Sequence, residues 1–186
     1  MTFQGGTLLM NNIFTEEQKK AIKSWTSPYK EYRYIKGVFK KTYNDSLKSI
    51  YENRANSLLS IFELNDNTDN NTLFRGDVLE DYTFLEFIKK YTVGTEISLG
   101  DSILSFTMDR NIATDSYKKS DKYRYKETPS ILYIIENRIS KFIDISRYSH
   151  FPNEKEVLSN KGKKFKITKV KTIEEDLHIE LYLDEI

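Results

Sequence analysis

The sequence predicts an α+β domain in which helices come first and strands follow. Apolar residues recur at helical spacing through the first third of the 186-residue chain, as in Ala21, Ile22 and Trp25. After a run of turn-forming residues at 65–72, short apolar segments alternate with polar residues, which is typical of β-strands. Because the two patterns occupy separate parts of the chain, we expect an α+β fold and not a regular βαβ repeat.

Residues 1–64 predict a helical region. The run Thr15-Glu16-Glu17-Gln18 resembles a capping box, so a helix is expected to begin there. Pro28 ends this helix, because a proline ring does not fit a helix interior. Two more helices are expected, one in the aromatic and apolar series 29–39 and a longer one at 43–64.

Residues 73–186 predict a β-rich core, and the loop 65–72 connects it to the helices. Beyond residue 72, strands are expected at 73–78, 95–99, 103–108, 130–136, 164–173 and 177–183, with short helices at 82–91 and after Asp109. The run 130–136 is the most apolar of the chain, so we expect it to be a central strand covered on both faces. The length suits one domain, spanning 1–186.

Composition limits the classes of function. Lysine and arginine total 29 against 28 aspartates and glutamates, so no overall field draws the chain to nucleic acid or to an anionic membrane. There is no cysteine, which rules out disulfides and cysteine-based zinc sites. His150 and His178 are isolated from each other in sequence, and we expect no metal site built on them, since catalytic zinc normally takes three protein ligands. The only apolar run near the N-terminus is 7–10, so we expect neither a signal peptide nor a membrane span.

The stretch 151–165 carries the most informative pattern. A Pro-Asn turn signal at 152–153 precedes residues that alternate as in a strand. Since alternate side chains of a strand share a face, Glu154 and Glu156 are expected to project the same way and to form a candidate site. The alternative is a solvated strand edge, because charged residues make up 31% of the chain and such pairs are common there.

Three features lie on three separate predicted strands: Arg75 with Gly76, Ser105 with Thr107, and Glu154 with Glu156. In this order they resemble the Arg, Ser and Glu-x-Glu signature of the mono-ADP-ribosyltransferases that modify arginine. Residues 74–76 are similar to the aromatic-Arg-Gly strand of that family, and 104–109 to its Ser-Thr-Ser strand. Phe106 and Thr107 depart from this pattern, because they stand where the family often has threonine and serine. The resemblance covers about residues 21–186 and implies a mixed, mainly antiparallel two-sheet core around an NAD cleft.

The resemblance implies transfer of ADP-ribose from NAD to an arginine of a target protein, with release of nicotinamide. Glu156 would stabilise the oxocarbenium-like ribose and bond its 2′-hydroxyl. Ser105 would hold the Glu156 carboxylate, and Arg75 would grip the diphosphate, since a planar guanidinium matches phosphate oxygens. Glu154 would pair with the acceptor guanidinium and help to remove its proton.

Further contacts are implied with NAD and with the target. Besides Arg75, Ser105 and Glu156, the resemblance places Gly76, Phe106, Thr107, Tyr117 and Arg124 at NAD, with Tyr117 stacking on nicotinamide and Arg124 meeting a phosphate. Tyr148 and Phe151 are candidates for contact with the target, and the alternative is that they pack back onto the core. We expect NAD as co-substrate and no metal.

Other functions remain open from the sequence. An NAD glycohydrolase would pass the ribosyl group to water, and an inactive domain would keep only the fold. The loop 117–126 interleaves tyrosines with basic residues as single-strand nucleic-acid binders do. The target implied by the resemblance carries an accessible arginine, with actin and bacterial host proteins as the two types. The chain is then a secreted toxin or a phage or bacterial cytoplasmic enzyme, and we expect a monomer.

Overall fold

The computed structural model describes residues 14–39, 48–64, 71–78, 84–118 and 129–186. The helical region contains the following elements: α1 (Glu16–Trp25), α2 (Lys30–Phe39), α3 (Lys48–Ser60) and the 3₁₀ turn η1 (Ile61–Glu63). The predicted capping box is confirmed. Thr15 Oγ1 accepts from the Gln18 N–H at 3.2 Å, and Gln18 Oε1 accepts from the Thr15 N–H at 2.8 Å. These two bonds satisfy N–H groups that a helix start leaves without partners.

The strands that the structure describes form one mixed sheet in the order β2-β7-β8-β4-β1-β3-β6-β5. Their bounds are β1 (Leu73–Val78), β2 (Glu96–Ser98), β3 (Leu104–Thr107), β4 (Ser130–Asn137), β5 (Phe142–Asp144), β6 (Glu156–Ser159), β7 (Lys164–Ile173) and β8 (His178–Glu185). Neighbouring strands run antiparallel except β4 and β8, which are parallel. The expected α+β class is therefore confirmed.

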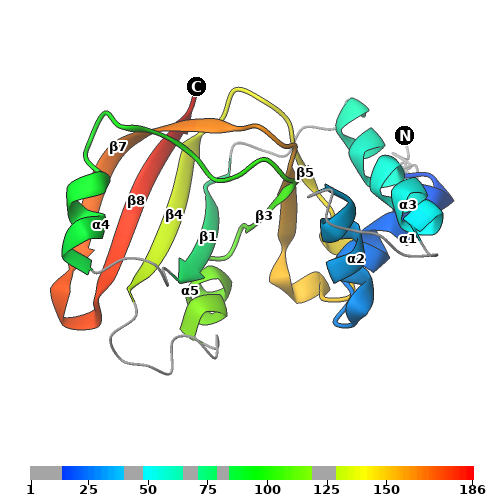
Figure 1. Ribbon diagram of the computed structural model, residues 1–186, viewed down its shortest axis with the longest axis horizontal. Coiled ribbons are helices and arrows are strands. Elements are labelled where there is room, and N and C mark those ends of the chain that lie inside the picture. The colour runs from blue at the N-terminus through cyan, green and yellow to red at the C-terminus, as the bar shows by residue number, and fades with distance from the viewer. Residues whose placement is uncertain (1–13, 40–47, 65–70, 79–83, 119–128) are drawn as a thin grey trace, which may run out of the picture.

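The expected division into two sheets is not confirmed, because hydrogen bonds join all these strands. The connection between the two halves is narrow. β1 pairs with β4 along its whole length, but with β3 only where Phe74 lies opposite Thr107. In Figure 1 the sheet bends at this position, with β7, β8, β4 and β1 on one side and β3, β6 and β5 on the other.

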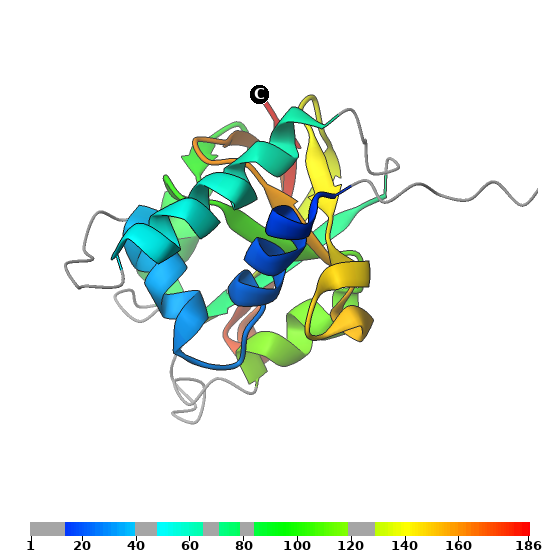
Figure 2. The ribbon, with the colours of Figure 1, turned by 90° about the vertical axis from the view of Figure 1, so that its right-hand side faces the viewer.

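Each half of the sheet is covered by different helices. Helices α1–α3 pack on the half that contains β3, β6 and β5, where Ile22 and Leu58 share a buried cluster with Ile143 and Leu158 (Figure 2). Helix α5 (Arg110–Lys118) covers β1 and β4. Helix α4 (Phe84–Lys90) packs through Phe84 and Ile88 against a buried cluster that includes Phe165 of β7. In the described residues, no helix has the length and apolarity that crossing a membrane requires.

The predicted central strand is confirmed. Residues 130–135 of β4 are all buried, and their side chains enter two clusters. Leu132 and Ile134 pack with Ala113 of α5, whereas Ile131 and Ile135 belong to the larger core. A strand with apolar side chains on both faces needs cover on both, which is what its sequence indicated.

Two local predictions are wrong. Helix α5 extends to Lys118, so Tyr117 lies in a helix and not in the expected loop, and residues 119–126 of that loop lie outside the described residues. Strand β6 begins at Glu156, because residues 152–154 form a 3₁₀ turn, η4 (Pro152–Glu154), instead of strand. Glu154 is therefore not a strand residue.

Candidate active site

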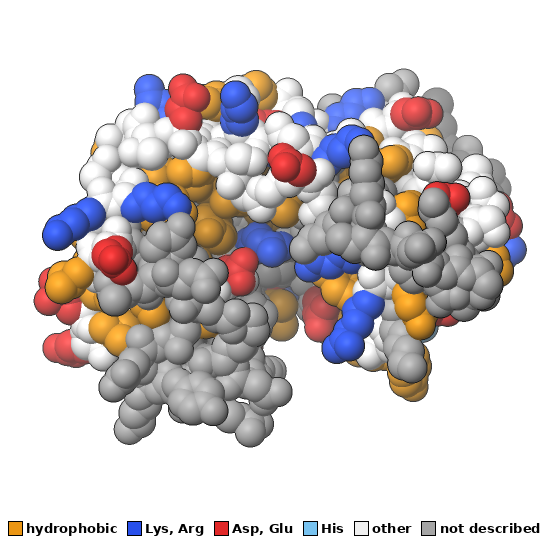
Figure 3. All heavy atoms as spheres, viewed as in Figure 1, with side chains coloured by type: hydrophobic (Ala, Val, Ile, Leu, Met, Phe, Trp, Pro, Cys, Tyr) orange, Lys and Arg blue, Asp and Glu red, His pale blue; other side chains and the backbone are white. Residues whose placement is uncertain are grey.

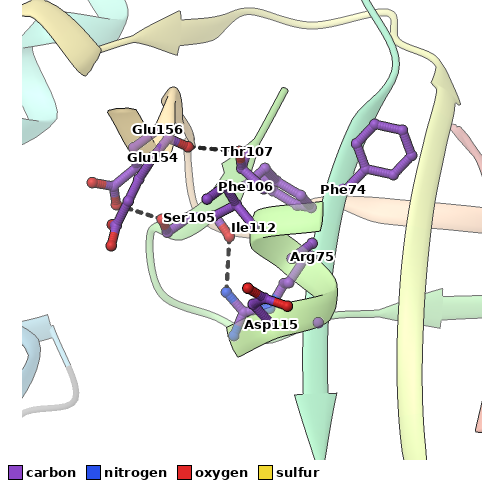
Figure 4. Close-up of a pocket in the computed structure, with 11 residues that line it drawn as sticks. Phe74, Arg75, Ser105, Phe106, Thr107, Ile112, Asp115, Glu154 and Glu156 are labelled. Atoms are coloured by element: carbon purple, nitrogen blue, oxygen red, sulfur yellow. Dashed lines mark hydrogen bonds between the residues drawn. The ribbon is translucent and has the colours of Figure 1, made fainter. Parts of the chain in front are cut away.

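Arg75, Ser105 and Glu156 lie on β1, β3 and β6, which are consecutive in the sheet order. Their side chains line one cavity of about 300 Å³, together with Gly76, Phe106, Thr107, Glu154 and residues of α5. Figure 4 shows Glu154 and Glu156 projecting to the same side, with Arg75 beyond Ser105. The fold thus collects in one place most of the residues that the sequence singled out.

Glu156 is held by two donors that converge on one of its oxygens. The Ser105 hydroxyl donates to Oε1, and the Trp25 indole Nε1–H donates to the same oxygen at 3.2 Å. No described residue donates to Oε2. The side chain is 9% exposed. Burial raises the pKa of the Glu156 carboxyl above its ordinary value, the bonds from Ser105 and Trp25 oppose this, and the nearby charge of Glu154 adds to it.

Arg75 lies where two cavities meet. Its Nη1 donates to the backbone carbonyl oxygen of Ser105 at 3.0 Å, and its Nη2 lies 3.6 Å from Asp77 Oδ2. The guanidinium lines both the cavity around Glu156 and a second one of about 520 Å³, which Trp25 and Lys36 also line. Figure 3 shows a hollow between the two halves of this face, with basic and acidic side chains beside it. Two cations at such a hollow suit an anionic ligand.

Glu154 reaches the site through a turn. Lys155 adopts the left-handed conformation (φ 48°, ψ 47°) between η4 and β6. Glu154 is exposed, yet it lines the cavity of Glu156 and a third cavity of about 210 Å³ that Trp25, Tyr32 and Phe151 border. The two carboxylates line the same cavities, as expected. Strand alternation is not the reason, because Glu154 lies in η4 and only Glu156 lies in a strand.

Thr107 fixes the backbone of this turn. Its hydroxyl donates to the carbonyl oxygen of Glu154 at 2.6 Å and accepts from the Asp109 N–H at 3.0 Å. Thr107 lies directly opposite Glu156 in the β3–β6 pairing. One side chain therefore ties the start of β6 to the segment that leads into α5.

The two loop aromatics differ in their surroundings. Tyr148 packs edge-on against Phe14, with ring centroids 5.3 Å apart, and it belongs to the helical core. Phe151 is 40% exposed and borders the third cavity. The geometry favours packing for Tyr148 and leaves Phe151 accessible. Arg124 lies outside the described residues, and the structure describes Tyr117 only as part of α5.

Sequence reasoning missed Trp25 as a site residue. Its helical spacing indicated a core position, and it is indeed 3% exposed, but its N–H reaches Glu156, 131 residues away in sequence. A buried indole N–H usually finds a polar partner, which is the signal that sequence offered. Identifying that partner required the fold.

The histidines take no part in the described cavities. His178 is buried and bonds the Ser130 hydroxyl through Nδ1 at 2.8 Å, whereas His150 is exposed. Among the described residues, no group of three or more histidine, aspartate or glutamate side chains is placed to hold a metal ion.

The chain is similar in fold to several solved structures. Vis toxin, an ADP-ribosyltransferase from Vibrio splendidus, has a TM-score of 0.69 at 14% identity, over 93% of this chain and 74% of that one. The Clostridium limosum C3 exoenzyme has a TM-score of 0.63 at 15% identity, over 93% of this chain and 86% of that one. Exoenzyme S from Pseudomonas aeruginosa was solved with human 14-3-3 protein beta and carba-NAD. It has a TM-score of 0.62 at 16% identity, over 94% of this chain and 76% of that one.

Sequence comparison gives the family. A search of curated protein sequences found no significant match. A profile of the ADP-ribosyltransferase exoenzyme family, however, matches residues 7–186, which is nearly the whole chain. The chain therefore belongs to the ADP-ribosyltransferase exoenzyme family and is an NAD-dependent ADP-ribosyltransferase.

Proposed function

We propose that the chain transfers ADP-ribose from NAD to an arginine side chain of a target protein. One observation carries this: two carboxylates, Glu154 and Glu156, line the same cavities but differ in environment. Glu156 is buried and bonded by two donors, whereas Glu154 is exposed. Two acids in different environments suit two different tasks.

The first task is cleavage of NAD. The bond between ribose C1′ and the nicotinamide nitrogen breaks, its electron pair leaves with nicotinamide, and positive charge develops on the ribose. The ionised carboxylate of Glu156 stabilises that charge, and its burial strengthens the attraction because fewer waters screen it. Ser105 and Trp25 hold Oε1, so Oε2 is the oxygen that is free to accept from a ribose hydroxyl.

The second task is activation of the acceptor. An arginine guanidinium is protonated at neutral pH and is a poor nucleophile, so a base must take a proton as its nitrogen bonds to C1′. Glu154 is accessible from solvent and borders the cavity that Phe151 and Tyr32 flank. Aromatic side chains at that cavity suit a cation.

We assign binding of the NAD diphosphate to the second cavity, which adjoins the cavity of Glu156 at Arg75. Arg75 and Lys36 line the second cavity and supply positive charge for a diphosphate. The Arg75 guanidinium already donates to the Ser105 carbonyl, so it is placed beside the strand that holds Glu156. A dinucleotide gripped here has its nicotinamide end directed to the carboxylates.

A small guanidinium compound tests the arginine specificity. Vis was solved in complex with agmatine, whose guanidinium resembles that of arginine, which supports agmatine as the probe. Incubation with labelled NAD and agmatine separates nicotinamide release from labelled product. We expect Glu156→Gln to lose both activities, and Glu154→Gln to lose transfer while it retains NAD hydrolysis.

A matched control is Glu174→Gln, which removes an exposed carboxylate from the turn between β7 and β8. It should behave as the wild type. Unchanged agmatine labelling by Glu154→Gln contradicts the arginine assignment. Nicotinamide release without any labelled agmatine or arginine-rich peptide supports the NAD glycohydrolase instead.

A further inference from the structure

Trp25, the only tryptophan of the chain, joins the helical region to the site. It is the last residue of α1, and its Nε1–H lies 3.2 Å from Glu156 Oε1. Its ring packs edge-on against Tyr32, with centroids 5.2 Å apart. At 3% exposure, the indole has little freedom to turn away.

The two donors to Glu156 come from different layers of the fold. Ser105 belongs to β3, in the same sheet as Glu156, whereas Trp25 comes from the helical layer. Both bond Oε1, so together they fix the rotation of the carboxylate and leave Oε2 without a donor among the described residues. A carboxylate held at a single oxygen by one hydroxyl keeps more rotational freedom than one held by two donors.

The end of α1 also contacts the segment before β6. Thr26 follows Trp25, and its hydroxyl oxygen accepts from the His150 N–H at 3.0 Å while it donates to the Ile22 carbonyl at 3.1 Å. Two consecutive residues therefore bond β6 and the loop that precedes it. The position of α1 is in this way coupled to that of Glu156.

We propose that Trp25 is a positioning residue for the reaction, whose indole N–H holds Glu156 Oε1 so that Oε2 faces the ribose of NAD. This rests on the role proposed for Glu156. The alternative is a core tryptophan whose N–H finds a convenient acceptor. The two hypotheses differ in their prediction for kcat. If Trp25 is a positioning residue, loss of its N–H lowers kcat, whereas loss of a merely structural N–H lowers only stability.

Trp25→Phe keeps an aromatic ring in the core and removes the N–H. We expect kcat for NAD hydrolysis to fall about tenfold, since a bond to a charged group is lost, with little change in KM. Because the N–H favours the ionised carboxylate, its removal raises the pKa of Glu156 further, and the acid limb of the pH–rate profile moves to higher pH.

Other ionisable groups face this pair across the cavities. They are Arg75 on β1, Tyr32 and Lys36 on α2, Asp101, Asp115 on α5, and Glu154. His150 is also near, through its backbone bond to Thr26. All of these remain in Trp25→Phe, so a shift of the acid limb in that variant reports the indole N–H and not their titration.

Tryptophan fluorescence gives a readout that needs no Trp25 variant. In the wild type, the fluorescence emission of Trp25 should change as Glu156 ionises. The midpoint pH of this change should equal that of the acid limb of the pH–rate profile, and Glu156→Gln should abolish the change. If Trp25→Phe does not fold, replacement of the single tryptophan by benzothienylalanine removes only the N–H. Ile61→Val loosens the same helical core away from the cavities and controls for stability.

The outcomes separate this proposal from the proposed function. Active Glu156→Gln overturns both. Inactive Glu156→Gln with a Trp25→Phe enzyme of wild-type kcat and pH profile leaves the function in place and overturns the role of Trp25. An equal loss in Ile61→Val and Trp25→Phe, or a fluorescence transition that persists in Glu156→Gln, also counts against it.

Discussion

The hydroxyl of Thr107 donates to the backbone carbonyl oxygen of Glu154 across 2.6 Å, so a side chain on β3 holds the turn that carries the second carboxylate. Family resemblance assigned Thr107 to NAD, at a position where the family often has serine. Its hydroxyl bonds Glu154 and Asp109. Thr107 is 7% exposed, so these bonds are shielded from water.

Thr107→Val should impair transfer more than NAD hydrolysis. The substitution keeps the shape but leaves the Glu154 carbonyl and the Asp109 N–H without this partner, and we expect the free energy of unfolding to fall by about 1–2 kcal/mol. Urea denaturation measures that loss, and agmatine labelling against nicotinamide release measures the change in activity. Thr114→Val is the control, because the Thr114 hydroxyl donates to the Arg110 carbonyl within α5. Equal loss of both activities in Thr107→Val speaks against a role through Glu154.

Arg75→Lys should weaken NAD binding. Lysine keeps the charge but presents it at one point, so it cannot donate to the Ser105 carbonyl and a phosphate with the same planar group. We expect KM for NAD to rise about tenfold or more, which matches the loss of one charge-assisted bond. Titration calorimetry with NAD checks this directly. Arg110→Lys, at an ion pair with Glu180 outside the cavities, should bind NAD as the wild type does.

Much of the fold follows from local patterns in the sequence. The capping box at Thr15 and the apolar run 130–135 each depend on residues close in sequence, and both were predicted correctly. The single pairing of Phe74 with Thr107 depends on how two halves of a sheet bend, which no local pattern specifies. For that reason the number of sheets was not predictable.

The site divides in the same way. The resemblance to a known family singled out Arg75, Ser105 and Glu156, and the adjacency of their strands brings the three residues together. Trp25 contacts Glu156 from the other end of the chain, and its helical spacing indicated only packing. Long-range bonds of this kind are fixed by tertiary packing, so sequence spacing does not reveal them.

Glu156→Gln should be more stable than the wild type at neutral pH. Because burial raises the pKa of the folded carboxyl, folding holds its proton more tightly, and ionisation opposes folding. That penalty is absent below about pH 4.3, where an unfolded glutamate is protonated, and it grows as pH rises through the raised pKa. Thermal melts should therefore show a higher Tm for the variant at pH 7.5 and equal values near pH 4. A gap that is largest at acid pH contradicts the assignment.

Lys155 offers a test of the turn itself. Its left-handed backbone (φ 48°) separates Glu154 from Glu156, and its ammonium lies 3.3 Å from Asp109 in an exposed ion pair. Glycine and asparagine adopt this backbone readily, whereas a β-branched residue costs about 1–2 kcal/mol more there. The exposed ion pair contributes at most about 1 kcal/mol.

We therefore expect Lys155→Asn and Lys155→Gly to fold and to retain agmatine labelling, although both lack the ammonium. Lys155→Val should be less stable than Lys155→Asn by about 1–2 kcal/mol, because its branched side chain clashes with the backbone at positive φ. If it folds, the turn relaxes and Glu154 moves relative to Glu156, so transfer should fall further than NAD hydrolysis. Urea denaturation measures the loss of stability, and incubation with labelled NAD and agmatine measures transfer against nicotinamide release. Equal transfer by Lys155→Val and Lys155→Asn rules out the left-handed turn as the feature that places Glu154.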